Sequence, residues 1–215
     1  MAATSNRCGI YLVVETGAAT AERAAAALAV ADIACLLIEP PEGAPLDERS
    51  ARPLVALAQS NNVAAVIAAD ARLARTLRAD GVHLPPSREP AKAFAAARGI
   101  LGQDFIIGAH AGKSRDDAML LGEAGADYVG FGAPGGVKDA EGARARRLEL
   151  LSWWAEIFEV PCVAFDVAAP EEANRLARAG ADFIGLRLEA EEAPADVTAR
   201  IRAVADAIGA GAPAL

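Results

Sequence analysis

The chain has 215 residues, of which 53% are hydrophobic and 23% are charged, and its formal net charge is -8. This composition excludes a disordered chain and predicts one well-packed domain over residues 1–215. The acidic balance argues against nucleic acid as a partner, and no apolar run reaches the roughly 20 residues that cross a bilayer. Because residues 1–8 also lack the apolar centre of a signal peptide, we expect a cytoplasmic protein with no membrane partner.

Eight short apolar runs predict strands, and most of them are continuous rather than alternating, which is typical of strands covered on both faces. The predicted strands span residues 9–14, 34–38, 64–68, 81–84, 105–108, 128–132, 161–165 and 183–188. Amphipathic stretches between them predict helices over residues 21–31, 48–59, 71–78, 90–97, 114–124, 147–158, 170–179 and 194–208.

A repeated Ala-Asp pair supports this alternation. The pair joins the end of a predicted helix to the start of a predicted strand at Ala79-Asp80, Ala126-Asp127 and Ala181-Asp182. Strands that alternate with helices in this way lie parallel, and no Gly-x-Gly-x-x-Gly turn of an open dinucleotide-binding sheet follows the first strand. The sequence therefore predicts a single-domain α/β protein, a closed (βα)8 TIM barrel.

Active sites of such barrels lie at the carboxyl ends of the strands, a region that we call the mouth. The charged or titratable residues at the predicted strand ends are Glu15, Glu39, Asp70, His83, His110, Lys138, Asp166 and Arg187. Any one of them could equally lie in a solvated loop or a salt bridge, so the prediction concerns the group as a whole.

The chain has two histidines, and both fall at predicted strand ends. His83 alternates with apolar residues, so a hydrogen-bonded histidine of the core or rim is the simpler interpretation and substrate binding is the alternative. His110 opens a Gly-containing loop, where a side chain can face a ligand. Because imidazole titrates near neutral pH, we predict that His110 is a catalytic acid or base, with Glu39 or Asp166 as its partner.

One Gly-rich loop after a strand also contains a cation, at residues 132–138. The backbone amides of Gly135 and Gly136 and the ammonium group of Lys138 could hold phosphate oxygens, and Arg187 is a further candidate for substrate binding. A flexible turn would require the same glycines, so both interpretations stay open.

Cysteine and tryptophan residues suggest packing rather than chemistry. Cys8, Cys35 and Cys162 lie near the starts of predicted strands without the spacing of metal ligands, which predicts small buried thiols. Trp153 and Trp154 share one predicted helix, and we expect them to pack against the barrel or against a second subunit of a homodimer.

Several strings of residues resemble one known family. They are Ala79-Asp80-Gly81-Val82-His83-Leu84, Ala124-Gly125-Ala126-Asp127-Tyr128-Val129-Gly130-Phe131-Gly132, Pro161-Cys162-Val163-Ala164 and Ala179-Gly180-Ala181-Asp182. In order and spacing these strings resemble thiamine phosphate synthase and its sister, the thiazole tautomerase. The resemblance implies a (βα)8 barrel. For the synthase it implies a transferase of thiamine biosynthesis that joins hydroxymethylpyrimidine pyrophosphate to thiazole phosphate with Mg²⁺.

The positions that carry the synthase chemistry hold other residues in this chain. The resemblance places Ala68 and Ala69 where the family has Asn-Asp, and Arg88 where it has a second magnesium carboxylate. It places Asp166 in the Gly-Gly segment that approaches the thiazole phosphate. Because a hard divalent cation needs oxygen ligands, we expect no resident cofactor, and Mg²⁺ only if the synthase reaction is retained.

Three functions are therefore open. The chain is a synthase of this family that acts with substituted residues, or it catalyses a metal-free, tautomerase-like proton transfer on a small ligand. Alternatively, it is a non-catalytic barrel that binds a ligand or a regulatory partner. In each enzymatic case the expected partner is a small molecule, such as a heteroaromatic phosphate.

Overall fold

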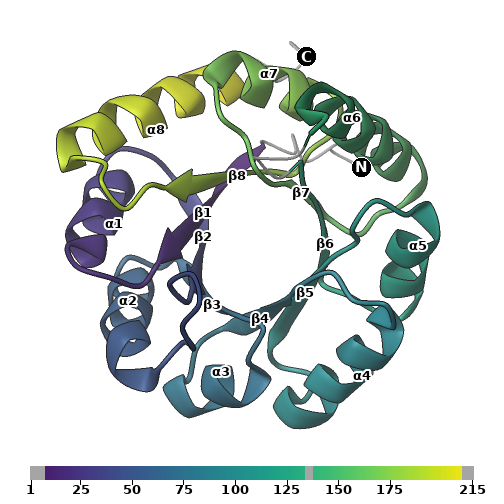
Figure 1. Cartoon of the computed structure of the whole chain (residues 1–215), viewed down its shortest axis with the longest axis horizontal. Helices are drawn as coiled ribbons and strands as arrows, with labels where there is room; N and C mark the ends of the chain where they lie inside the picture. Colours follow the sequence, from purple (N-terminus) through teal and green to yellow (C-terminus); the bar gives the residue numbers. More distant parts are fainter. Residues whose placement is uncertain (1–7, 134–137, 210–215) are drawn as a thin grey trace, which may run out of the picture.

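The computed structural model describes residues 8–133 and 138–209, which form eight parallel strands closed into one barrel with the helices outside (Figure 1). The strands follow one another in chain order around the barrel, and β1 pairs with β8 to close it. This architecture confirms the predicted single-domain (βα)8 barrel. Its strands are β1 (Gly9–Glu15), β2 (Ile33–Glu39), β3 (Ala64–Ala68), β4 (Gly81–Leu84), β5 (Ile106–His110), β6 (Tyr128–Phe131), β7 (Cys162–Ala164) and β8 (Phe183–Leu188).

Each strand is followed by one helix of the outer ring. The helices are α1 (Thr20–Leu28), α2 (Glu48–Ser60), α3 (Ala71–Leu77), α4 (Pro90–Leu101), α5 (Arg115–Glu123), α6 (Ala140–Ile157), α7 (Pro170–Arg178) and α8 (Pro194–Gly209). Within the described residues, no helix combines the length and the apolar character that a membrane span requires.

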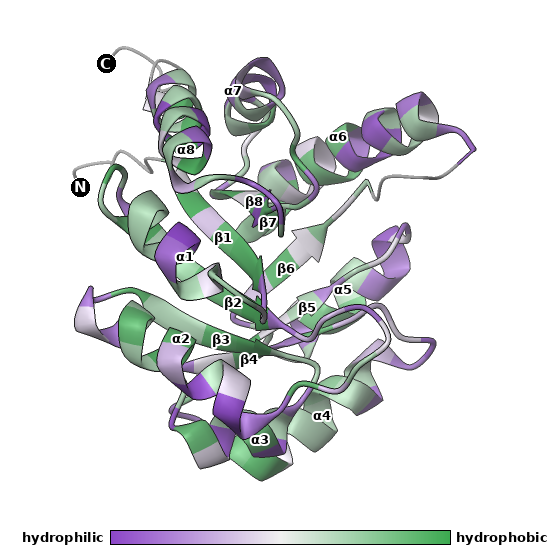
Figure 2. Ribbon diagram, turned by 60° about the vertical axis from the view of Figure 1, so that its left-hand side comes forward, coloured by the Kyte–Doolittle hydropathy of each residue, from purple (hydrophilic) through white to green (hydrophobic). Residues whose placement is uncertain are grey.

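The continuous hydrophobic strands are explained by two separate cores. Tyr11 and Val13 of β1 point into the barrel, whereas Leu12 and Val14 of the same strand pack in the layer between strands and helices. In Figure 2 hydrophobic colour runs along the strands, whereas the helices carry both hydrophobic and hydrophilic colour. Both faces of each strand are therefore buried, as in other parallel barrels.

The aspartates of the repeat join neighbouring strands at their amino ends. Asp80, Asp127 and Asp182 each precede an even-numbered strand, and each accepts a hydrogen bond from the backbone N–H at the start of the preceding strand. The donors are Ala65 at 2.8 Å, Ile107 at 2.7 Å and Cys162 at 2.8 Å. The same three aspartates donate their own N–H groups to the carbonyls of these residues. The repeat therefore stabilises the floor of the barrel, away from the mouth.

Helix α6 differs most from the sequence prediction. It begins at Ala140 rather than at residue 147, because Asp139 caps it by accepting a hydrogen bond from the Gly142 N–H at 2.8 Å. Arg147 consequently lies inside the helix and is 1% exposed. The capping residue decides where a helix begins. The glycine at position 142 disfavours a helix in the sequence pattern, so the pattern did not predict this first turn.

Buried thiols and indoles occupy the places expected for packing residues. Cys35 and Cys162 are buried, as predicted, whereas Cys8 is partly exposed. Burial raises the pKa of each of these thiols to about 12. Trp154 is fully buried and stacks on Phe158 with ring centroids 3.9 Å apart, so this indole packs against the barrel and not against a second subunit.

Candidate active site

The mouth of the barrel contains a cavity of about 480 Å³. Five of the predicted site residues line it, and these are Glu39, His83, His110, Asp166 and Arg187. Apolar side chains of Val13, Leu37 and Phe165 form part of its wall. The size and the mixture of apolar walls with a few polar groups suit a small organic ligand.

His110 ends β5 and presents one defined nitrogen to the cavity. The Gly112 N–H donates a hydrogen bond of 2.9 Å to His110 Nδ1, so the proton of the neutral ring lies on Nε2. Burial lowers the pKa of His110 below its usual 6.5, and the nearby Asp166 carboxylate opposes this shift. At neutral pH the ring is therefore uncharged and offers an Nε2–H donor.

Gly132 marks the place where His110 and Asp166 converge. A β-carbon built on Gly132 would lie 2.7 Å from His110 Nε2 and 2.7 Å from Asp166 Oδ2. The imidazole N–H, a hydrogen-bond donor, and the carboxylate oxygen, an acceptor, therefore lie on either side of the small volume over Gly132. The structure therefore places Asp166, one of the two partners that the sequence analysis left open, beside His110.

Asp166 follows β7 in an unusual backbone conformation. Its φ of 60° lies in the left-handed region, which residues other than glycine rarely adopt. Asp166 is one of five described non-glycine residues with a positive φ, and it is the one of the five that lines the mouth cavity. The position also agrees with the glycine that the family resemblance implies there.

His83 is held by a chain of buried hydroxyl groups. Its Nδ1 lies 3.0 Å from the Tyr128 hydroxyl, which lies 2.6 Å from the hydroxyl of Tyr11. Burial, with a smaller contribution from His110, lowers the pKa of His83 to about 3. His83 is therefore a neutral, hydrogen-bonded rim residue whose ring also forms part of the cavity wall.

Glu39 and Arg187 contact each other at the mouth. Arg187 Nη2 donates to Glu39 Oε2 at 2.6 Å, and both side chains are partly exposed. Glu39 therefore has a partner other than His110. The pair contributes charge to the cavity wall with no net charge of its own.

The predicted phosphate-binding loop gives a different result. Lys138 is exposed and is not among the described residues that line the mouth cavity. Gly135 and Gly136 lie outside the described residues. Lys113, which the sequence analysis did not select, does line the cavity. Its position after the His110-Ala111-Gly112 turn is the only sequence signal that could have identified it.

The described residues do not fit the magnesium ion that the family resemblance implies. Asp70, the carboxylate nearest the end of β3, caps α3 by accepting from the N–H groups of Arg72 and Leu73 at 2.9 Å. Glu39 is paired with Arg187. Over residues 8–133 and 138–209, no group of three or more His, Cys, Asp or Glu side chains could hold a metal ion.

Comparison with known proteins gives a consistent result. A family model described as thiamine monophosphate synthase matches residues 10–189. A thiamine-phosphate synthase of Rhodospirillum centenum is 38% identical over 187 residues, which are 83% of this chain and 87% of that relative. The thiamine-phosphate synthase of Erythrobacter litoralis is 44% identical over 140 residues, and this match spans 64% of each chain, less than two thirds of that relative.

The fold also matches a solved structure. Thiamine phosphate pyrophosphorylase from Pyrococcus furiosus superposes with a TM-score of 0.75 at 22% identity, over 97% of this chain and 99% of that chain. At this identity the likeness concerns the barrel and not the site.

Proposed function

Since this chain belongs to the thiamine monophosphate synthase family, we propose that its mouth binds a small heteroaromatic phosphate and catalyses a proton transfer on it without a metal. The observation that carries this proposal is the convergence of His110 Nε2 and Asp166 Oδ2 on the volume over Gly132. The family supplies the class of ligand, and the two side chains supply the chemistry.

Asp166 and His110 have different tasks in this reaction. The Asp166 carboxylate takes a proton from one atom of the bound ring and returns it to another, so that the protein and the ligand together gain and lose no proton. Neutral His110 donates its Nε2–H to an acceptor atom of the ring and stabilises the negative charge that develops there. A neutral imidazole in this role needs a lowered pKa, and burial provides it.

Binding of the ligand relies on the rest of the cavity. Phe165 and His83 offer ring faces against which a heteroaromatic can pack, since both line the cavity with their centroids 5.1 Å apart. Lys113 supplies a cation for the phosphate. Asp166 would repel a phosphate at the position that the resemblance implies, so the phosphate is expected on the Lys113 side.

Two assays with the purified protein test this proposal. Thermal unfolding with thiazole phosphate in excess EDTA should show stabilisation by about 2.7 kcal/mol at a hundredfold excess over the dissociation constant. Asp166→Asn should retain this stabilisation and lose catalysed exchange of ligand protons with solvent. Stabilisation without any exchange in the unmodified protein would rule out the proton transfer and leave a non-catalytic ligand-binding barrel or the synthase reaction.

The second candidate is thiamine phosphate synthesis itself, which the relatives named as synthases at 38% and 44% identity favour. Magnesium-dependent formation of thiamine phosphate from hydroxymethylpyrimidine pyrophosphate and thiazole phosphate would establish it. No such product at any magnesium concentration would exclude the synthase reaction and leave the proton-exchange assay to decide between metal-free catalysis and a non-catalytic barrel.

Cellular and quaternary features belong to the same proposal. A cytoplasmic location and a homodimer agree with a biosynthetic barrel, although Trp154 does not contribute to a dimer contact. Light scattering of the purified chain measures the oligomeric state.

A further inference from the structure

Arg147 and Glu172 form a buried ion pair that the proposed chemistry does not use. Arg147 Nη2 lies 2.5 Å from Glu172 Oε1, and the two side chains are 1% and 9% exposed. Arg147 comes from α6 and Glu172 from the first turn of α7, so the pair links the helices on either side of β7. Neither residue lines the mouth cavity.

The remaining hydrogen-bonding groups of the pair hold the loop between β7 and α7. Arg147 Nη1 donates to the carbonyl oxygens of Phe165 at 2.5 Å and Asp166 at 3.1 Å. Glu172 Oε2 accepts from the Ala168 N–H at 3.0 Å. The pair therefore fixes the backbone at Asp166 and on both sides of it.

Asp166 has a left-handed φ of 60°, a conformation that depends on the contacts around it. A residue with a β-carbon leaves this region when its surroundings permit, and its side chain would then turn to another direction. Burial of a guanidinium group is itself unfavourable, and Arg147 Nε has no hydrogen-bond partner among the described residues. The burial of this ion pair lowers the stability of the fold, and its hydrogen bonds go to the loop between β7 and α7. These two features suit a pair that positions the loop.

We propose that Arg147 and Glu172 are positioning residues that hold the Asp166 carboxylate beside His110 Nε2. This inference rests on the proposed function in one respect: the alignment matters for catalysis only if Asp166 transfers the proton. The alignment itself can be measured without any catalytic activity.

The measurement is an NMR titration of the two histidines in the full chain. Asp166 raises the pKa of His110, so the titration of His110 reports whether the carboxylate is in place. The other charged or titratable groups at this cavity are His83, Glu39, Lys113 and Arg187, and they stay unchanged in the test and control variants. Asp166→Asn sets the reference shift toward lower pKa, and His83→Gln assigns the two signals.

The test variant is the double substitution Arg147→Met with Glu172→Gln, which removes both charges together. Loss of one partner alone would leave an unpaired buried charge and could prevent folding. Arg147→Lys is the second variant, because it keeps the charge but cannot bridge both carbonyls and Glu172. Arg144→Met is the matched control, since Arg144 lies on the same helix 3.7 Å from Glu172 and makes no described contact with the loop carbonyls.

We expect the double variant and Arg147→Lys to lower the pKa of His110 in the same direction as Asp166→Asn, and the control to leave it unchanged. Adding Asp166→Asn to the double variant should then have a smaller effect than in the unmodified chain. An unchanged His110 pKa in the double variant, or a full additional shift on adding Asp166→Asn, would overturn the positioning role. Absence of proton exchange in the unmodified protein would count against the proposed function alone.

Discussion

At the scale of single residues, a substitution at Gly132 tests whether the ligand binds between His110 and Asp166. The three atoms nearest to the β-carbon of Gly132→Ala would be the ends of the His110 and Asp166 side chains, which can move. We expect this variant to fold normally and to lose affinity for thiazole phosphate by at least about tenfold, or about 1.4 kcal/mol, because the methyl group fills the reacting volume.

Thermal-shift titration measures the affinity of Gly132→Ala, and its unfolding temperature without ligand serves as the internal control. Gly108→Ala offers a contrast, since its β-carbon would lie 1.9 Å from the Tyr128 ring and should destabilise the fold. Unchanged ligand affinity in Gly132→Ala would place the site elsewhere.

His83 predicts a pH dependence of stability. Its pKa of about 3 in the folded state lies below the usual 6.5, so between these pH values the unfolded chain binds more protons than the folded chain. The free energy of unfolding should therefore fall as the pH falls through this window, by up to about 1.4 kcal/mol per pH unit for this histidine.

Urea unfolding at about pH 7 and about pH 5 checks this dependence. His83→Gln removes the titrating group, so the difference in unfolding free energy between the two pH values should be smaller than in the unmodified chain. His110→Gln is the comparison, because His110 is less buried than His83. An equal pH dependence with and without His83 would be incompatible with a neutral buried ring.

At the scale of elements, the repeated aspartates fix the register between neighbouring parallel strands by accepting hydrogen bonds from the backbone of the adjacent strand. Asp127→Ala would leave the N–H of the buried Ile107 without its acceptor at the start of β5. We expect a loss of about 1–3 kcal/mol in the free energy of unfolding, and a smaller loss for Asp127→Asn, which keeps an oxygen acceptor.

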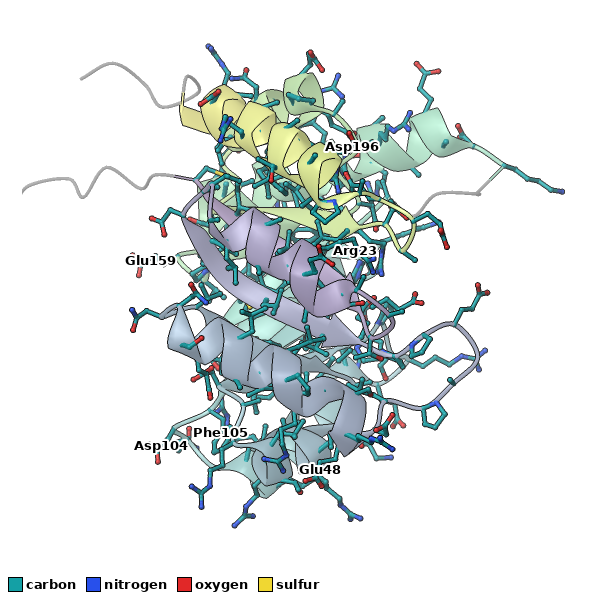
Figure 3. The ribbon with its side chains drawn as sticks, turned by 90° about the vertical axis from the view of Figure 1, so that its left-hand side faces the viewer. Arg23, Glu48, Asp104, Phe105, Glu159 and Asp196 are labelled. Carbon is teal, nitrogen blue, oxygen red and sulfur yellow. The ribbon has the colours of Figure 1, made fainter. Side chains whose placement is uncertain are left out.

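Asp104→Ala is the matched control, because Asp104 is an exposed carboxylate in the loop before β5 (Figure 3). Chemical denaturation of the three variants gives the comparison. Equal stability of Asp127→Ala and Asp104→Ala would show that the repeat has no structural role.

The elements themselves were largely predictable from the sequence, since hydrophobic runs and Ala-Asp pairs report local structure. The exceptions follow from side chains that act across the fold. Arg147 resembled the exposed arginines beside it until α6 proved to begin earlier and to bury it. The Glu39–Arg187 pair joins residues far apart in the chain, and the single-nitrogen presentation of His110 depends on the backbone of Gly112. These three features depend on contacts between distant parts of the fold or on backbone geometry, so a local sequence pattern could not predict them.

At the scale of the whole molecule, the barrel and its mouth point to different conclusions. The barrel retains the closed strand order, the interior core and the floor aspartates, and these agree with membership of the family. The mouth retains a cavity of suitable size but presents a neutral imidazole, a strained carboxylate and a closed ion pair. The proposed function follows from these groups, because an uncharged donor and a carboxylate can move a proton on a bound ring, whereas a pyrophosphate leaving group needs positive charge.

The most direct test is a proton NMR time course in D₂O with both family substrates, first in excess EDTA and then with added Mg²⁺. We expect enzyme-dependent exchange of a thiazole phosphate proton in EDTA, a decrease of about a hundredfold or more in Asp166→Asn, and no thiamine phosphate after Mg²⁺ is added. Appearance of thiamine phosphate on addition of Mg²⁺, with no exchange before it, would contradict a metal-free mouth.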